Sequence, residues 1–129
     1  GASKVIPLKV SAPFHCELMR PVADSLEKEF HKMKWSAPSA PIVANVDSSL
    51  LDSAESIQEA LYRQTFSPVL WADGVTVMEK AGVDLFLEFG PGSVLSGLIK
   101  RTCKGKKCVS VNRPSDMAKA LEAIGGVAS

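Results

Sequence analysis

Residues 83–93 read Val-Asp-Leu-Phe-Leu-Glu-Phe-Gly-Pro-Gly-Ser, and this stretch decides the fold class. Its first seven residues (VDLFLEF) are mostly apolar and include types that favour strands, which predicts a strand over 83–89. Gly90-Pro91-Gly92 predicts a tight turn, and Ser93 stands where it would cap a helix that runs to Arg101. The chain is therefore expected to pass from a strand through a short turn into a helix.

The same alternation of strand and helix extends in both directions. We expect an edge strand over 4–10, a short buried strand over 42–46, a loop over 47–51 and a strand over 107–111. Helices are expected over 17–35, 52–66, 68–80 and 114–124. Strands that are separated by helices indicate an α/β fold with a mostly parallel sheet.

Three of these helices have specific sequence support. In the helix over 17–35, apolar residues recur at spacings of three and four and form one stripe, namely Leu18, Val22, Leu26, Phe30 and Met33. In the helix over 52–66, Asp52 and Glu55 are spaced as a capping box. Gly82 is a natural stop after the helix over 68–80.

Composition narrows the class of protein. The 129 residues are 46% hydrophobic and 22% charged, with a formal net charge of +1, which argues against disorder, collagen and a simple coiled coil. The near-neutral balance gives no global bias toward nucleic acid or an anionic membrane. The sequence has no apolar run near the roughly 18 residues that a membrane span needs.

The cysteines and the first residues of the sequence further limit the class of protein. The three cysteines, Cys16, Cys103 and Cys108, are too few for a disulfide framework, and no second close pair of Cys or His suggests zinc. We interpret them as reduced thiols of an intracellular protein. The chain starts at Gly1 without a signal-peptide pattern, so a lost Met, a tag remnant and the interior of a longer protein all remain open.

His15 is the main candidate for chemistry. It lies in the segment 11–16 (SAPFHC), between an expected strand and an expected helix, where α/β proteins often place functional groups. The alternative is a helix-capping histidine without chemistry. A dyad with the adjacent Cys16 is disfavoured, the G-x-S-x-G elbow of serine hydrolases is absent, and His31 is expected on a solvated face.

Two further motifs have both a structural and a functional interpretation. The 90–95 stretch (GPGSVL) lacks the Walker and dinucleotide-binding patterns, so we favour a structural turn over a phosphate loop. A basic cluster is either a solvated loop or a docking patch for an acidic partner, and its cations are not interleaved with aromatic residues as nucleic-acid binding would favour. It comprises Lys100, Arg101, Lys104, Lys106, Lys107 and Arg113.

Three segments together resemble one family. Residues 11–19 (SAPFHCELM), 63–71 (RQTFSPVLW) and 88–98 (EFGPGSVLSGL), in this order and spacing, are similar to the C-terminal part of malonyl-CoA:acyl-carrier-protein transacylases. The same family includes the acyltransferase domains of polyketide and fatty acid synthases. The segment Asn45-Val46-Asp47 also fits, and the resemblance extends from the first residues to about Ile124.

The resemblance implies a fold and a reaction. Residues 1–10 would end a ferredoxin-like subdomain, and residues 11–129 would form the C-terminal part of an α/β-hydrolase-like domain. In the family, a serine in a G-H-S-x-G elbow attacks the malonyl thioester of coenzyme A and a histidine takes its proton. The phosphopantetheine thiol of acyl carrier protein then attacks the malonyl-serine. This implies a cytoplasmic enzyme of fatty acid biosynthesis with no metal and no bound cofactor.

Five residues acquire roles through the resemblance. His15 matches the catalytic histidine, and Gln64 matches the residue whose backbone carbonyl orients it. Phe14 matches a bulky position associated with malonyl selection, and Asn45 and Val94 match substrate-binding positions near the active site. The serine elbow, the malonate-binding arginine and the oxyanion-hole segments are not in this sequence. The chain alone is therefore expected to be inactive and to need the N-terminal part of the same enzyme.

The expected partners are acyl carrier protein and malonyl-CoA, with no nucleic acid and no membrane. Lys104, Lys106 and Lys107 are the candidate docking residues for the acidic carrier protein. Three alternatives remain: an acyltransferase domain fragment of a polyketide synthase, a non-catalytic carrier-binding or scaffold domain that keeps the fold, and an unrelated α/β binding protein.

Overall fold

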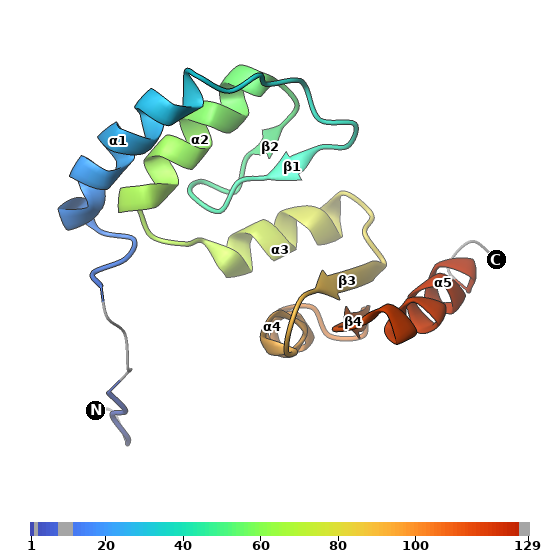
Figure 1. Ribbon diagram of the computed structural model, residues 1–129. Helices are drawn as coiled ribbons and strands as arrows, with labels where there is room; N and C mark the ends of the chain where they lie inside the picture. The colour runs from blue at the N-terminus through green and yellow to red at the C-terminus, as the bar shows by residue number, and fades with distance from the viewer. Residues whose placement is uncertain (2, 8–11, 127–129) are drawn as a thin grey trace. The chain divides into compact units, whose positions relative to one another are not determined.

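The computed structural model describes residues 1, 3–7 and 12–126 of the chain (Figure 1). They form two compact units. The first unit comprises Gly1–Val46 and Leu50–Val69, and the second comprises Asp47–Ser49 and Leu70–Ser129. Among the described residues, no helix has both the length and the apolar character that crossing a membrane requires.

The first unit contains two packed helices and a short hairpin-like pair of strands. Helices α1 and α2 lie side by side (Figure 1), and β1 pairs antiparallel with β2, with Ile42 opposite Leu51. A small core of Ala44, Leu51 and Ala60 lies between the strands and α2. The elements are the 3-10 turn Glu17–Met19, α1 (Arg20–Phe30), β1 (Ile42–Val43), β2 (Leu50–Leu51) and α2 (Ala54–Phe66).

The helix expected over 17–35 is shorter than its apolar pattern predicted. It begins as a 3-10 turn and ends at Phe30, where the N–H groups of Lys32 and Met33 bond three residues back, to Glu29 and Phe30. The indole N–H of Trp35 also donates to the Phe30 carbonyl, at 2.9 Å. The expected apolar stripe is also not the packing face. Leu18 and Met33 are 74% and 57% exposed, whereas the small Ala23 is fully buried.

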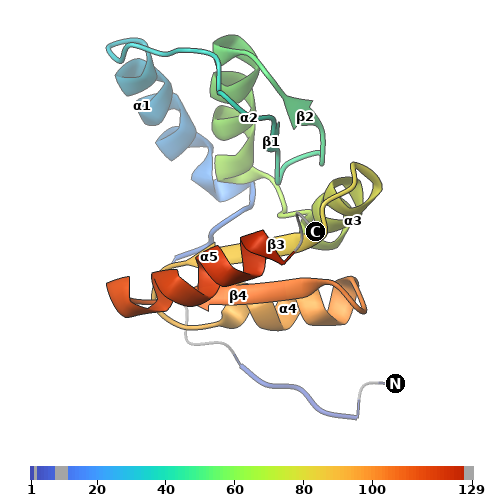
Figure 2. The same cartoon turned by 90° about the vertical axis from the view of Figure 1, so that its right-hand side faces the viewer.

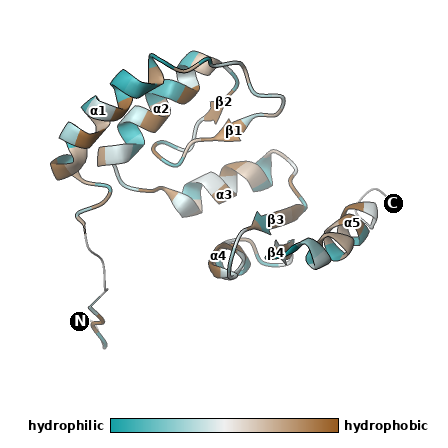
Figure 3. Ribbon diagram, in the orientation of Figure 1, coloured by the Kyte–Doolittle hydropathy of each residue, from teal (hydrophilic) through white to brown (hydrophobic). Residues whose placement is uncertain are grey.

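Other expectations for the first unit need correction. Residues 4–7 form no strand, and the rest of the expected strand over 4–10 lies outside the described residues. The strand over 42–46 is limited to Ile42–Val43, since the chain turns at 45–47, and the expected loop contains β2. Figure 3 shows both short strands coloured as hydrophobic, although Leu50 is 54% exposed.

The capping box of α2 uses serines rather than acidic residues. Ser53 Oγ accepts the N–H of Ser56 at 3.2 Å, and Ser56 Oγ accepts the N–H of Ser53 at 3.3 Å. The predicted pair of Asp52 and Glu55 is therefore wrong by one residue. Ser53 has the extended backbone of an N-cap residue, which lets its short side chain reach the free N–H groups of the first turn.

The second unit contains a parallel strand pair covered on both faces. Strands β3 and β4 pair in parallel, with Leu85 opposite Lys107 and Phe89 opposite Val111. Figures 1 and 2 show α4 and α5 on opposite faces of this pair. The elements are α3 (Trp71–Lys80), β3 (Leu85–Phe89), α4 (Val94–Thr102), β4 (Lys107–Val111), the 3-10 turn Pro114–Asp116 and α5 (Met117–Gly125).

The core of the second unit joins α3, β3 and α4. Val75, Phe86, Ile99 and Cys103 are each at most 7% exposed, and Trp71, Met78, Val83 and Cys108 pack against them. The α/β class, the parallel pairing of these two strands and the strand–turn–helix order over 83–101 are confirmed. The antiparallel pair in the first unit departs from the expected mostly parallel sheet.

Helix α3 starts later than its proline predicted. It begins at Trp71 rather than at Pro68. The side-chain amide of Gln64 donates to the carbonyls of Ser67 and Pro68, at 3.0 and 3.2 Å, so these residues are held in the connection that follows α2. The last expected helix likewise begins as a 3-10 turn at Pro114 before α5.

Candidate active site

His15 and Gln64 meet in the first unit. His15 lies in the turn before Glu17–Met19, and Gln64 is in the last turn of α2. His15 Nδ1 is 3.1 Å from the backbone oxygen of Gln64, across 49 positions of sequence. The same carbonyl also accepts the N–H of Ser67, the residue after α2, at 3.4 Å. A carbonyl oxygen has two lone pairs, so it can accept from His15 as well.

This contact fixes which nitrogen of the imidazole holds the proton. A carbonyl oxygen only accepts hydrogen bonds, so Nδ1 must donate to it, and Nε2 of neutral His15 is then the acceptor. The side-chain amide nitrogen of Gln64 also lies 3.5 Å from Nδ1, but a protonated Nδ1 does not accept from it. The arrangement therefore leaves Nε2 free to take a proton from another group.

His15 adopts an unusual backbone conformation. Its φ is +59°, in the left-handed region that residues other than glycine seldom occupy. The ring is solvent-exposed, and its neighbour Cys16 turns its thiol to the Pro13 carbonyl at 3.1 Å. A dyad between Cys16 and His15 is thus not supported. Strained backbone of this kind is found more often at functional sites than elsewhere.

The other candidate substrate residues are distributed over both units. Phe14, next to His15, is 59% exposed. Asn45 lies in the turn after β1 and, together with Gln64, borders a largely apolar cavity of about 270 Å³ formed by β1, β2 and α2. Val94 is the first residue of α4 in the second unit and is 72% exposed.

Glu88, which was not predicted as a functional residue, caps the helix that follows the glycine turn at residues 90–92. The Glu88 carboxylate accepts the N–H groups of Leu95 and Ser96, at 3.0 and 2.9 Å, and the Ser96 hydroxyl at 2.5 Å. The bond from the Ser96 hydroxyl, with the two backbone N–H groups, lowers the pKa of Glu88. Ser93 makes no side-chain cap, although it is the residue directly before the helix.

Because Glu88 already occupies these N–H groups, the turn is not an open anion site. The N–H of Gly92 is likewise taken, by the Asn112 side chain at 2.6 Å. Gly90 and Gly92 have φ values of +135° and +96°, which explains why glycines stand at both positions. These contacts support the interpretation of the motif as a structural turn.

The lysines of the proposed docking cluster differ in availability. Lys106 forms an ion pair with Asp84 at 2.6 Å, its side chain is 23% exposed, and the bond to Asp84 raises its pKa. Lys104 and Lys107 are exposed. The charge that faces solvent in this cluster thus comes from Lys104 and Lys107 more than from Lys106.

The cysteines of the described residues are free thiols. Cys103 is 1% exposed, and its Sγ lies 3.4 Å from a carboxylate oxygen of Glu79. Burial, reinforced by that carboxylate, raises the pKa of the Cys103 thiol. A buried thiol that resists ionisation is a structural residue rather than a nucleophile.

The fold and the His15–Gln64 pair describe an α/β chain that presents an oriented histidine, and comparisons with known proteins identify its relatives. No protein-family model matches the chain. Malonyl CoA-acyl carrier protein transacylase of Escherichia coli K12 is 44% identical over 122 residues, which are 95% of this chain and 40% of that protein. The enzyme of Bacillus subtilis is 35% identical over 124 residues.

Solved structures give the same relationship. An acyl carrier protein S-malonyltransferase from Vibrio cholerae aligns with a TM-score of 0.87 and 41% identity, covering 93% of this chain and 39% of that one. A malonyl-transacylase in complex with a type II polyketide acyl-carrier protein aligns with a TM-score of 0.88 and 41% identity, covering 95% and 40%. The resemblance to malonyl transacylases is confirmed, and the chain spans about two fifths of the length of the relatives it matches.

Proposed function

We propose that this chain belongs to a malonyl-CoA:acyl-carrier-protein transacylase of fatty acid biosynthesis and supplies its general base, His15. The observation that supports this most directly is the 3.1 Å contact between His15 Nδ1 and the Gln64 carbonyl, which leaves Nε2 as the acceptor. In this proposal, residues 1–10 end a ferredoxin-like subdomain. Residues 11–129 form the C-terminal part of an α/β-hydrolase-like domain.

The proposed reaction uses Nε2 of His15 in both half-reactions. His15 takes the proton of a serine hydroxyl in the N-terminal part of the enzyme as the serine oxygen attacks the malonyl thioester. The imidazolium then gives this proton to the coenzyme A thiolate that leaves as the thioester bond breaks. In the second half, His15 takes the proton of the carrier thiol, which attacks the malonyl-serine ester, and the serine oxygen recovers the proton as it leaves.

The substrate-binding roles belong to the same proposal. Phe14 would limit the size of the acyl group, while Asn45 and Val94 would contact the substrate near the reacting carbon. Because the nucleophile would come from another part of the enzyme, we expect the 129-residue chain alone to catalyse no malonyl transfer. Turnover by the isolated chain would contradict this part of the proposal.

The test of the general base is His15→Asn in the whole enzyme. Loss of a general base is expected to lower kcat by about 10²–10⁴-fold, because the serine proton then has no acceptor. His31→Asn is the matched control, since His31 is exposed just after α1 and has no role in the proposed reaction. Near-normal malonyl transfer by His15→Asn would rule out His15 as the base and favour a non-catalytic, carrier-binding role.

Carrier docking at the basic cluster is the second part of the proposal. The relative seen in complex with an acyl-carrier protein supports a carrier as the partner. Lys104, Lys106 and Lys107 would face the acidic carrier, with Lys104 and Lys107 contributing most because Asp84 holds Lys106.

Charge reversal tests this surface. The double substitution Lys104→Glu, Lys107→Glu is expected to raise KM for the carrier protein and leave kcat unchanged, because opposite charges at an interface mainly assist association. The same reversal at the exposed Lys28 and Lys34 serves as the control for net charge. An unchanged KM in the cluster variant would reject the patch.

A further inference from the structure

We propose that Arg20 is a positioning residue that holds the His15 ring against the Gln64 carbonyl. The inference rests on the proposed function, in which that contact prepares His15 as a base. It explains what keeps the exposed side chain of His15, whose backbone is strained, in one orientation. Three contacts around the His15–Gln64 pair support it.

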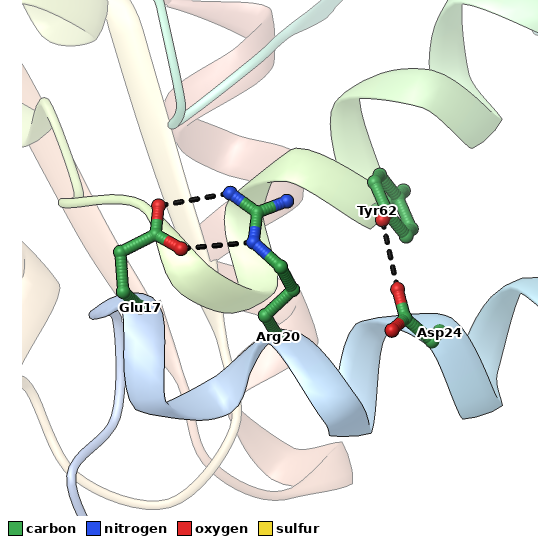
Figure 4. Close-up of polar contacts among 4 residues, drawn as sticks. All are labelled: Glu17, Arg20, Asp24 and Tyr62. Atoms are coloured by element: carbon green, nitrogen blue, oxygen red, sulfur yellow. Dashed lines mark hydrogen bonds and ion pairs between the residues drawn. The ribbon is translucent and has the colours of Figure 1, made fainter.

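The first contact joins Arg20 to the segment that follows His15. Arg20 Nε and Nη2 each donate to one carboxylate oxygen of Glu17, both at 2.9 Å (Figure 4). Glu17 is two residues after His15, at the start of the 3-10 turn. A bidentate ion pair of this kind fixes both the orientation and the distance of the two side chains, because the planar guanidinium matches the carboxylate along one edge.

The second contact joins the same guanidinium to the end of α2. The central carbon of the Arg20 guanidinium lies 3.9 Å from the centre of the Phe66 ring. Phe66 is the last residue of α2, two residues after Gln64. Arg20 therefore touches one residue near each member of the His15–Gln64 pair, and it connects the two segments whose separation sets the hydrogen bond.

The third contact secures α1 to α2 on the other side of Gln64. The Tyr62 hydroxyl donates to Asp24 Oδ1 at 2.9 Å (Figure 4), and this bond raises the pKa of Tyr62. Tyr62 packs edge-on against Phe66, with ring centres 5.3 Å apart. Residues four apart share one face of a helix, so Tyr62 and Phe66 present a common surface to α1, two positions before and after Gln64.

Exposure of these groups indicates positioning rather than stability as their main effect. The side chains of Arg20 and Glu17 are 46% and 71% exposed, and exposed ion pairs stabilise folded proteins little. A shift of the His15 segment by a fraction of an ångström would nevertheless lengthen its hydrogen bond to Gln64. Loss of Arg20 should thus affect the orientation of His15 more than the folding of the chain.

The test compares Arg20→Gln and Arg20→Lys with Lys32→Gln. Lys32 is the matched control because it forms an i,i+3 pair with Glu29 at 2.7 Å, just past the other end of α1. Nitrogen-15 NMR of the His15 ring in the full 129-residue chain reports which nitrogen holds the proton. Urea unfolding of the same chain reports stability, and malonyl transfer by the whole enzyme reports kcat and KM.

Arg20→Gln is expected to shift His15 from the Nδ1–H form toward the Nε2–H form. It should also lower kcat by about 10-fold or more, since small misplacements of a catalytic group are costly. KM and the unfolding midpoint should stay near the wild-type values. Arg20→Lys keeps the charge but loses the two-pronged geometry, so it should recover only part of kcat. Lys32→Gln should match the wild type in every measurement.

Two outcomes would overturn the positioning role. One is an unchanged His15 tautomer in Arg20→Gln, whatever happens to kcat. The other is a lower kcat that is fully explained by a lower unfolding midpoint. Failure of the proposed function looks different, because His15→Asn would then keep its activity while the NMR shift in Arg20→Gln could still be observed.

Discussion

At the scale of the residue, Glu88 links folding stability to pH in the acid range. Its pKa lies below the ordinary 4.5 in the folded chain, chiefly because the Ser96 hydroxyl and two backbone N–H groups bind the charged form. The stabilisation is therefore complete above the pKa of the unfolded chain and is lost as pH falls through the folded-state value. We expect Glu88→Gln to be less stable than the wild type at pH 7, with the difference shrinking under acid conditions.

Urea unfolding across the acid range measures this effect. Glu122→Gln on the exposed side of α5 removes one carboxylate without a cap and should follow the wild-type pH dependence. If Glu88→Gln and the wild type kept the same difference in unfolding free energy from pH 7 to below pH 4, the charged cap would be refuted.

The contacts of individual residues differed in how well they could be predicted from the sequence. His15 and Gln64 were predicted to meet, but only the family resemblance paired two residues 49 positions apart. Glu88 was missed because capping rules consider the residue directly before a helix. Here the cap comes from β3, seven and eight residues before the N–H groups that it accepts. The bond between Asp84 and Lys106 was missed for a similar reason, since only the parallel pairing of two strands brings them together.

At the scale of the element, prediction succeeded best for the two strands that pair in parallel. Strand β4 has the predicted bounds, and β3 begins two residues later than expected, because both lie between two layers of helix. Two-residue strands such as β2 have no detectable periodicity, so a loop was expected there. The apolar stripe of α1 extended the predicted helix past Phe30. An apolar pattern does not reveal that the Trp35 indole donates a hydrogen bond to a carbonyl at the end of the helix.

At the scale of the whole chain, each of the two units has a core of its own. Ala44, Leu51 and Ala60 form one, and Val75, Phe86, Ile99 and Cys103 form the other. The resemblance assigns residues 11–129 to one domain, and that assignment stays a prediction, because compact units can be parts of one domain. Separate cores imply that a cavity in one unit should weaken that unit first.

Ile99→Ala tests this division. Ile99 is 5% exposed, so its truncation is expected to destabilise the second unit by about 2–5 kcal/mol. Hydrogen exchange should then accelerate for amides of β3, β4 and α4, whereas α1 and α2 keep their protection. Leu51→Ala, at a residue 7% exposed in the other core, should give the opposite pattern. Equal loss of protection in both units from either substitution would mean that the chain unfolds as one cooperative body, and the two cores would then be parts of a single domain.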